Sequence, residues 1–186
     1  MNRKYRRKYL FEFAKEKTNY KNKFYKIVFH AEQEDISRII RMVSYNSSMK
    51  MRIENILFPK NIYDMCSNKI VINTEISIDY LRSYYIRIFC KYKEYIEGYI
   101  DMKNQYEKFL FSEQYAEALH VINNIEEKMG LSVWSISKRM YLYDKVYGLE
   151  RHKRYLSELQ NNANNNILLS TLFELESYFA ESNTSY

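Results

Sequence analysis

The residue types that most often carry chemistry, histidine and cysteine, are few in this chain and lie far apart. Its 186 residues include three histidines, His30, His120 and His152, and two cysteines, Cys66 and Cys90. Metal sites place such residues at short spacings, as in His-Glu-x-x-His, and no such spacing occurs. The chain also lacks a Walker phosphate loop, a Gly-x-Ser-x-Gly elbow and the kinase signatures. We therefore expect no catalytic residue, no metal and no cofactor, and hence no enzymatic activity.

The other residues that could suggest catalysis are explained more simply by packing in the core or by exposure to solvent. No arginine lies five residues before a histidine, so the Arg-x4-His spacing of helical ribonucleases is missing. The run Glu126-Glu127-Lys128 contains a Glu-x-Lys step found in some nucleases, but no acidic strand precedes it, which favours an exposed charged helix face. His120 and His152 fall near helix seams and are expected to pack rather than react. Both cysteines are expected to be buried free thiols in a reducing cytoplasm.

The clearest binding chemistry belongs to the basic N-terminal segment, residues 1–26. It holds ten Lys or Arg and two Glu, whereas the remaining 160 residues hold 19 basic and 21 acidic residues. Clustered cations contact phosphates, and the interleaved aromatic rings could stack on single-stranded bases. Three roles stay open for the segment: binding nucleic acid, docking on an acidic partner protein, or forming a solvated helix face. The candidate binding residues are its densest cations, Arg3, Lys4, Arg6, Arg7 and Lys8.

Composition indicates which elements must position these residues. The chain has three Gly, one Pro and 20 Tyr, and 46% of its residues are hydrophobic. So few glycines cannot supply the turns of hairpin-rich or doubly wound folds, and long helices with few corners are favoured. No apolar run approaches the ~18 residues of a membrane-spanning helix, so we expect no membrane partner and a cytoplasmic location.

We predict an all-α fold in which antiparallel helical hairpins form a solenoid-like array with one long central helix. A basic N-terminal helical segment covers residues 1–60, and a helical-repeat-like body covers residues 61–186. Within the first part, residues 3–17 predict a helix, and residues 24–29 suit either a short strand or a helix. Residues 34–57 predict a helix, with a potential interruption at residues 46–48, that ends before Pro59.

The strongest periodicity in the chain lies in residues 76–111. One helix through this region would be ~50 Å long, unless Gly98 divides it into two. The seam packs against helices of the same chain or, alternatively, pairs with a second chain. Its apolar side chains follow alternating steps of four and three residues: Leu81, Tyr85, Ile88, Tyr92, Tyr95, Tyr99, Met102, Tyr106 and Phe109.

The C-terminal part predicts four shorter helices. The first covers residues 114–129 and ends at Gly130, and the second begins at a Ser132 cap and ends at Gly148. A third follows and stops at an asparagine-rich run. The last helix has an apolar seam that reaches almost to the final residue, so we expect the chain to continue there or to meet a partner. This seam consists of Leu168, Leu172, Leu175 and Phe179.

Residues 111–130 resemble the second half of a tetratricopeptide repeat. Ala118 stands at the small position that lets the two helices of such a repeat approach, and Gly130 stands at the closing breaker. The next unit, residues 131–164, has a similar rhythm but carries His152 where alanine is expected. The resemblance implies an α-solenoid-like array that binds other proteins.

The stretch that includes Gly130, Ser132, Trp134 and Gly148 also resembles helical proteins encoded in bacterial anti-phage defence operons. This resemblance implies a sensor, scaffold or inhibitor role, with the effector chemistry in another protein. We therefore predict a non-catalytic interaction or scaffold subunit of a larger bacterial complex, bound to an effector or sensor subunit or to itself. Two alternatives remain, a nucleic-acid-binding protein and a toxin-like effector. Because tyrosine and tryptophan are enriched at interfaces, the candidate partner-binding residues are Trp134, Tyr141 and Tyr143.

Replacing Arg3, Arg6, Arg7 and Lys8 by Glu tests the nucleic-acid alternative. If the basic segment binds phosphates, retention on immobilised DNA or RNA falls steeply as salt rises and is lost in the quadruple variant. The measurement is elution of both proteins over a salt gradient. Salt-insensitive retention, or no retention of the unaltered chain, would contradict this alternative.

Overall fold

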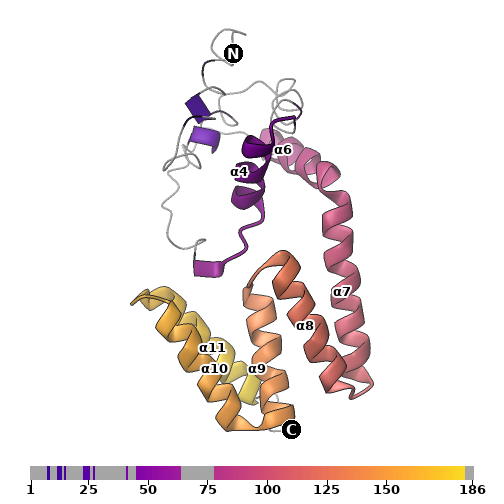
Figure 1. The fold of residues 1–186 in the computed structure, drawn as a ribbon, viewed down its shortest axis with the longest axis vertical. Coiled ribbons are helices and arrows are strands. Elements are labelled where there is room, and N and C mark those ends of the chain that lie inside the picture. The colour runs from indigo at the N-terminus through magenta and orange to yellow at the C-terminus, as the bar shows by residue number, and fades with distance from the viewer. Residues whose placement is uncertain are drawn as a thin grey trace. The chain divides into compact units, whose positions relative to one another are not determined.

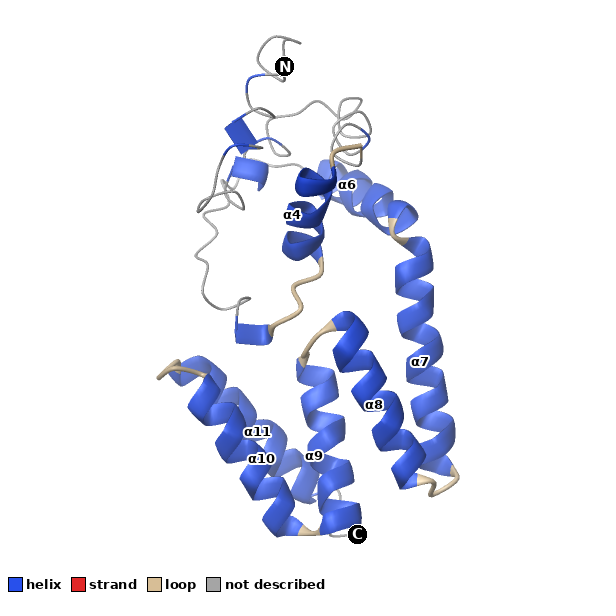
Figure 2. Ribbon diagram, viewed as in Figure 1, coloured by secondary structure: helices blue, strands red, loops and turns tan. Residues whose placement is uncertain are grey.

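A computed structural model describes most of the chain and shows helices as its regular elements (Figures 1 and 2). No strand occurs among the described residues, which confirms the predicted all-α class. Contacts divide the chain into two units, Met1–Phe58 with Lys69–Glu94, and Pro59–Asn68 with Tyr95–Tyr186. The predicted division at residue 60 had instead assigned everything after it to one body. The described residues are 8, 12, 13, 15, 23–25, 27, 41, 45–63 and 78–182.

The first unit contains α4, Ser47–Leu57, and α6, Ile78–Lys91. Helix α4 begins where the Asn46 side chain accepts a hydrogen bond from the Met49 amide, at 3.1 Å. It ends before Pro59, as predicted, whereas most of the predicted helix N-terminal to residue 45 lies outside the described residues. Residues 23–25 and 27 have helical backbone, so the ambiguous segment is helical where it is described.

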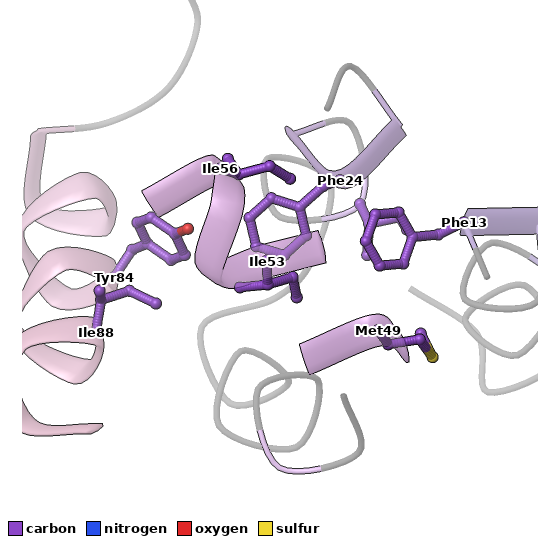
Figure 3. Packing of buried hydrophobic residues seen from close by; sticks show 8 residues of the cluster. Phe13, Phe24, Met49, Ile53, Ile56, Tyr84 and Ile88 are labelled. Carbon is purple, nitrogen blue, oxygen red and sulfur yellow. The ribbon is translucent and has the colours of Figure 1, made fainter. Parts of the chain in front are cut away.

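The first unit has its own apolar core, drawn in Figure 3. Phe13 and Phe24 approach with ring centroids 5.8 Å apart, and Ile53 and Ile56 of α4 lie in the same cluster. Arg52 fastens this cluster to the backbone, because its Nη1 donates to the Phe13 carbonyl at 2.8 Å. From α6 the cluster receives buried side chains one turn apart, Tyr84 and Ile88.

The region of strongest periodicity forms two helices, α6 and α7, the latter spanning Lys93–Phe111. The interruption falls at Tyr92, whereas Gly98 lies inside α7. The predicted seam is buried at Ile88 and Tyr106 but wrong at Tyr85, which is exposed while its neighbour Tyr84 is buried. The two choices differ by 100° around the helix, and the periodicity alone did not separate them.

The second unit centres on α9, Val133–Tyr147. This helix contacts α8, Tyr115–Met129, α10, Leu149–Asn162, and α11, Ile167–Ser182, and α10 also contacts α11. Side chains of α7 and α8 form one apolar cluster against α9, and side chains of α10 and α11 form another. A repeat arrangement of these helices stays a prediction.

The residues that end and begin helices in the second unit lie where the sequence predicts them. Gly130 ends α8 and Gly148 ends α9, both with positive φ angles, 90° and 82°. Ser132 caps α9 by accepting from the Ser135 amide at 3.2 Å. Between α10 and α11 the turn uses Asn164 and Asn165 at positive φ, which asparagine tolerates better than most residues.

Residues 59–63 belong to the second unit because their backbone is fixed against the α8–α9 turn. The Leu131 amide donates to the Lys60 carbonyl at 2.9 Å. A Cβ atom at Gly130 would lie 2.2 Å from that same oxygen, so glycine is required by both contact and conformation. The Tyr63 hydroxyl donates to the Leu159 carbonyl at 3.3 Å. None of the helices in the described part of the chain is long and apolar enough to cross a membrane.

The variants Gly130→Ala and Gly148→Ala separate the effect of the contact with Lys60 from the effect of the backbone conformation. At Gly148 an added Cβ meets no atom within 4 Å, so the cost is backbone strain alone, about 1–3 kcal/mol. At Gly130 the clash with Lys60 adds to the same strain, and we expect a total loss of about 3–5 kcal/mol. Urea denaturation followed by circular dichroism measures both. Equal stability of the two variants would contradict the close approach of Lys60.

Candidate interaction surface

The structure describes one of the five basic N-terminal candidates. Lys8 is exposed and has helical backbone, while Arg3, Lys4, Arg6 and Arg7 lie outside the described residues. Their proposed contact with nucleic acid or an acidic partner therefore stays a prediction.

Trp134, a candidate partner-binding residue, is half-buried between α9 and α7. Its ring meets Tyr106 edge-on at 5.3 Å between centroids and Tyr99 at 6.2 Å. The Lys103 ammonium lies 5.0 Å from the indole centroid, a distance that suits a cation–π contact. These contacts give Trp134 a packing role between two helices of the same chain.

Tyr143 and Tyr141, the other two candidates, also contribute to packing. Tyr143 is 8% exposed, so its ring offers almost no surface to a partner in this structure. Its hydroxyl accepts from Arg139 Nη1 at 3.1 Å, and the Arg151 guanidinium lies 4.8 Å from its ring centroid. Tyr141 is half-buried and packs against both apolar clusters of the second unit.

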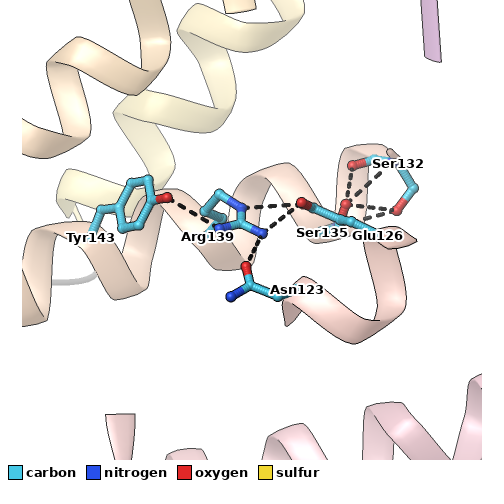
Figure 4. A network of polar contacts seen from close by, with 6 residues as sticks. All are labelled: Asn123, Glu126, Ser132, Ser135, Arg139 and Tyr143. Atoms are coloured by element: carbon cyan, nitrogen blue, oxygen red, sulfur yellow. Dashed lines mark hydrogen bonds and ion pairs between the residues drawn. The ribbon is translucent and has the colours of Figure 1, made fainter. Parts of the chain in front are cut away.

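Arg139 forms the most extensive polar network of the second unit (Figure 4). Its Nη2 donates to Glu126 Oε2 at 2.6 Å and to Asn123 Oδ1 at 2.7 Å, and its Nε donates to Glu126 Oε1 at 3.3 Å. Burial alone would lower the pKa of Arg139, but the Glu126 carboxylate offsets this effect and raises the pKa. The guanidinium is therefore a permanent cation that joins α8 to α9.

The sequence argument missed this pair, because it assigned Glu126 to an exposed charged face. A signal was present: Arg139 directly precedes Met140 of the predicted apolar seam, where an unpaired charge would be costly. Glu127 and Lys128, the other residues of that run, are exposed.

A second polar network joins α10 to α11. His152 Nε2 lies 2.9 Å from the Ser177 hydroxyl, which donates to Glu181 Oε1 at 3.1 Å, and Lys153 forms an ion pair with Glu181. Burial lowers the pKa of His152, which favours the neutral imidazole. Because His152 and Ser177 are both buried, the pair offers no accessible nucleophile.

Two expectations about individual residues were wrong. His120, expected to pack in a helix seam, is exposed, and Cys90, expected to be a buried thiol, is an exposed free cysteine. Cys66 lies outside the described residues. Within the described part of the chain, no group of His, Cys, Asp or Glu side chains is arranged to hold a metal ion.

Helix α11 has an apolar face that is wider than the part the chain covers. Leu169, Phe173 and Ala180 are buried against α9 and α10. The sequence seam had predicted the adjoining part of this face as the packed one, and three of its residues are exposed, from 49% for Leu175 to 79% for Leu168. Positions i, i+7 and i+11 fall within about 40° of each other around a helix. We call these three residues, Leu168, Leu175 and Phe179, the α11 stripe.

A second exposed stripe with the same spacing lies on α6, in the first unit. It consists of Ile78, Tyr85 and Phe89, which are between 48% and 83% exposed, and we call it the α6 stripe. Arg82 lies beside it and is exposed. On α11, Glu174 and Glu176 lie about 100° to either side of Leu175 around the helix, outside the α11 stripe.

Breaking the buried ion pair tests its structural role. We expect Arg139→Met to lower the free energy of unfolding by about 2–4 kcal/mol, since it leaves the largely buried Glu126 carboxylate without its partner. Arg154→Ala, which removes an exposed i,i+4 pair with Glu150, is the matched control and should cost under about 0.5 kcal/mol. Urea denaturation compares them. Equal midpoints would show that Arg139 does not stabilise the α8–α9 contact.

Comparisons with known proteins give no relative whose role could be transferred. No protein-family model, no curated protein and no solved structure matches the chain. The resemblance of residues 111–130 to a tetratricopeptide repeat accordingly stays a prediction. The two exposed stripes are the features on which a functional proposal rests.

Proposed function

We propose that the chain is a non-catalytic subunit of a larger protein complex and that a protein partner docks on the α11 stripe. One observation carries this proposal: the chain covers only part of the apolar face of α11, and Leu168, Leu175 and Phe179 stay exposed. The apolar face of a helix is normally packed against other elements. Contiguous exposed apolar surface on a protein commonly marks an interaction site.

The energetics of covering the stripe are favourable. Burial of a Leu or Phe side chain contributes about 1.5–3 kcal/mol when it is complete. Since Leu168, Leu175 and Phe179 are half to four-fifths exposed, full cover would contribute about 1–2 kcal/mol from each. The helix that carries them is already fixed by α9 and α10, so docking does not have to pay the entropy of ordering it.

The proposal also covers the biological role and the cellular location of this complex. The resemblance around Gly130, Ser132, Trp134 and Gly148 supports a scaffold or sensor in a bacterial anti-phage defence system. A cytoplasmic location is in keeping with the free thiol of exposed Cys90, because such thiols persist in reducing compartments.

Photocrosslinking from the stripe tests the proposal. With benzoylphenylalanine at position 175 and expression in the native host, we expect a discrete protein adduct on irradiation. The adduct should disappear when Leu168→Asp and Phe179→Asp are added, because charged side chains prevent apolar docking. Benzoylphenylalanine at position 111 is the control, since Phe111 is exposed but lies outside both stripes. An adduct pattern at position 175 that is no different from that at position 111 would refute the proposal.

A further inference from the structure

We propose that His152 makes the contact between α10 and α11 sensitive to pH. The neutral imidazole holds α11 in place, and protonation of its Nδ1 atom in mildly acidic solution loosens the helix. This inference goes beyond the proposed function, because it concerns how firmly α11 is attached and stands whether or not a partner docks on the α11 stripe. It rests on one buried ring and on the hydrogen bonds that determine where its proton lies.

The imidazole of His152 is completely buried where α10 meets α11. Its exposed fraction is 0%, and that of Ser177, which faces it from α11, is 2%. The Nε2 atom lies 2.9 Å from the Ser177 hydroxyl oxygen. The Nδ1 atom is also buried, and it has no hydrogen-bond partner in the described part of the chain. The two ring nitrogens therefore differ: one belongs to a polar network and the other lies outside it.

The network around Ser177 determines which ring nitrogen carries the proton. The Ser177 hydroxyl has a single hydrogen, which it donates to Glu181 Oε1 at 3.1 Å. An ionised carboxylate can only accept, so the hydrogen between these two oxygens must come from the serine. His152 Nε2 then has to donate to the Ser177 oxygen. The neutral imidazole therefore carries its proton on Nε2, and Nδ1 is the atom that a second proton would occupy.

Protonation of Nδ1 is unfavourable while α11 is in place. It would create a buried cation with a new N–H group that meets no acceptor among the described residues. A buried donor or charge without a partner costs free energy, which is recovered when the ring is exposed to water. The protonated ring is therefore more stable when α11 has moved away from α10 than when the contact is closed.

The surroundings of the ring favour the neutral form as a whole. Burial is the largest effect and lowers the pKa of His152. Glu181 of α11 and Asp144 of α9 favour the protonated ring, whereas Lys153, the next residue on α10, opposes it. Lys153 also forms an ion pair with Glu181 and donates to the Ser177 oxygen at 3.4 Å, which offsets the Glu181 carboxylate.

Acid accordingly favours the detached state of α11. In that state the ring is in water and titrates near pH 6.5. In the closed contact the ring binds a proton less readily, so the detached state gains population as the pH falls below about 6.5. Because one proton is involved, the ratio of detached to attached α11 rises by up to about tenfold between pH 7.5 and 5.5. The Glu181 carboxylate stays ionised in this range, because the hydrogen bond from Lys153 lowers its pKa.

Nuclear magnetic resonance of the full, unaltered chain tests the protonation state directly. In protein labelled with ¹⁵N on its histidine rings, we expect His152 to carry its proton on Nε2 at pH 7.5 and to titrate with a pKa below 6.5. The signals of His152 are assigned by their loss in His152→Gln. A neutral ring with its proton on Nδ1, or a pKa of 6.5 or higher, would overturn the inference, and neither result depends on how stable the variant is.

Hydrogen–deuterium exchange of α11 tests the consequence for the helix. After correction for the intrinsic effect of pH on amide exchange, α11 should exchange faster at pH 5.5 than at pH 7.5, by up to about tenfold. His152→Gln keeps a donor for the Ser177 oxygen but cannot be protonated, so its corrected rates should be equal at the two pH values. His120→Gln, which removes an exposed imidazole on α8, is the matched control and should behave as the unaltered chain does. Equal corrected rates in the unaltered chain, or an undiminished pH effect in His152→Gln, would also overturn the inference.

Discussion

Burial of α9 is the constraint on which the second unit depends. Buried and half-buried side chains project from most of its circumference, so α8, α10 and α11 must all lie against it. Arg139 lies among them and is accommodated because Glu126 and Asn123 of α8 supply its partners. The glycine at position 130 then sets how closely the Lys60 backbone approaches the α8–α9 turn.

This arrangement explains why α11 is left with uncovered apolar surface. The helix uses Leu169, Phe173 and Ala180 to cover α9 and α10, and the described part of the chain leaves the α11 stripe exposed. A sequence under selection to remain monomeric would carry polar residues there. We interpret the α11 stripe as a surface for assembly. The polar networks of the second unit, by contrast, join helices of the chain to one another.

The sequence predicts the all-α class and the helix ends, because glycine, proline and cap residues act locally. It does not predict which part of a helix is buried when the apolar face is wider than the contact with the rest of the chain. On α11 the predicted seam packs at Leu172 but is exposed at Leu168, Leu175 and Phe179, and on α6 the sequence selected Tyr85 instead of Tyr84. The Arg139–Glu126 pair was also missed, since it depends on how two helices face each other, which periodicity within each helix does not determine.

The central claim is that the outer side of α11 is covered when the protein is assembled. Hydrogen–deuterium exchange of residues 167–182 tests it most directly, by comparing the dilute chain with the assembly purified from its native host. The account predicts slower amide exchange in α11 within the assembly, while α9, already buried in the isolated chain, changes little. Unchanged exchange in α11, with new protection appearing elsewhere, would contradict the account.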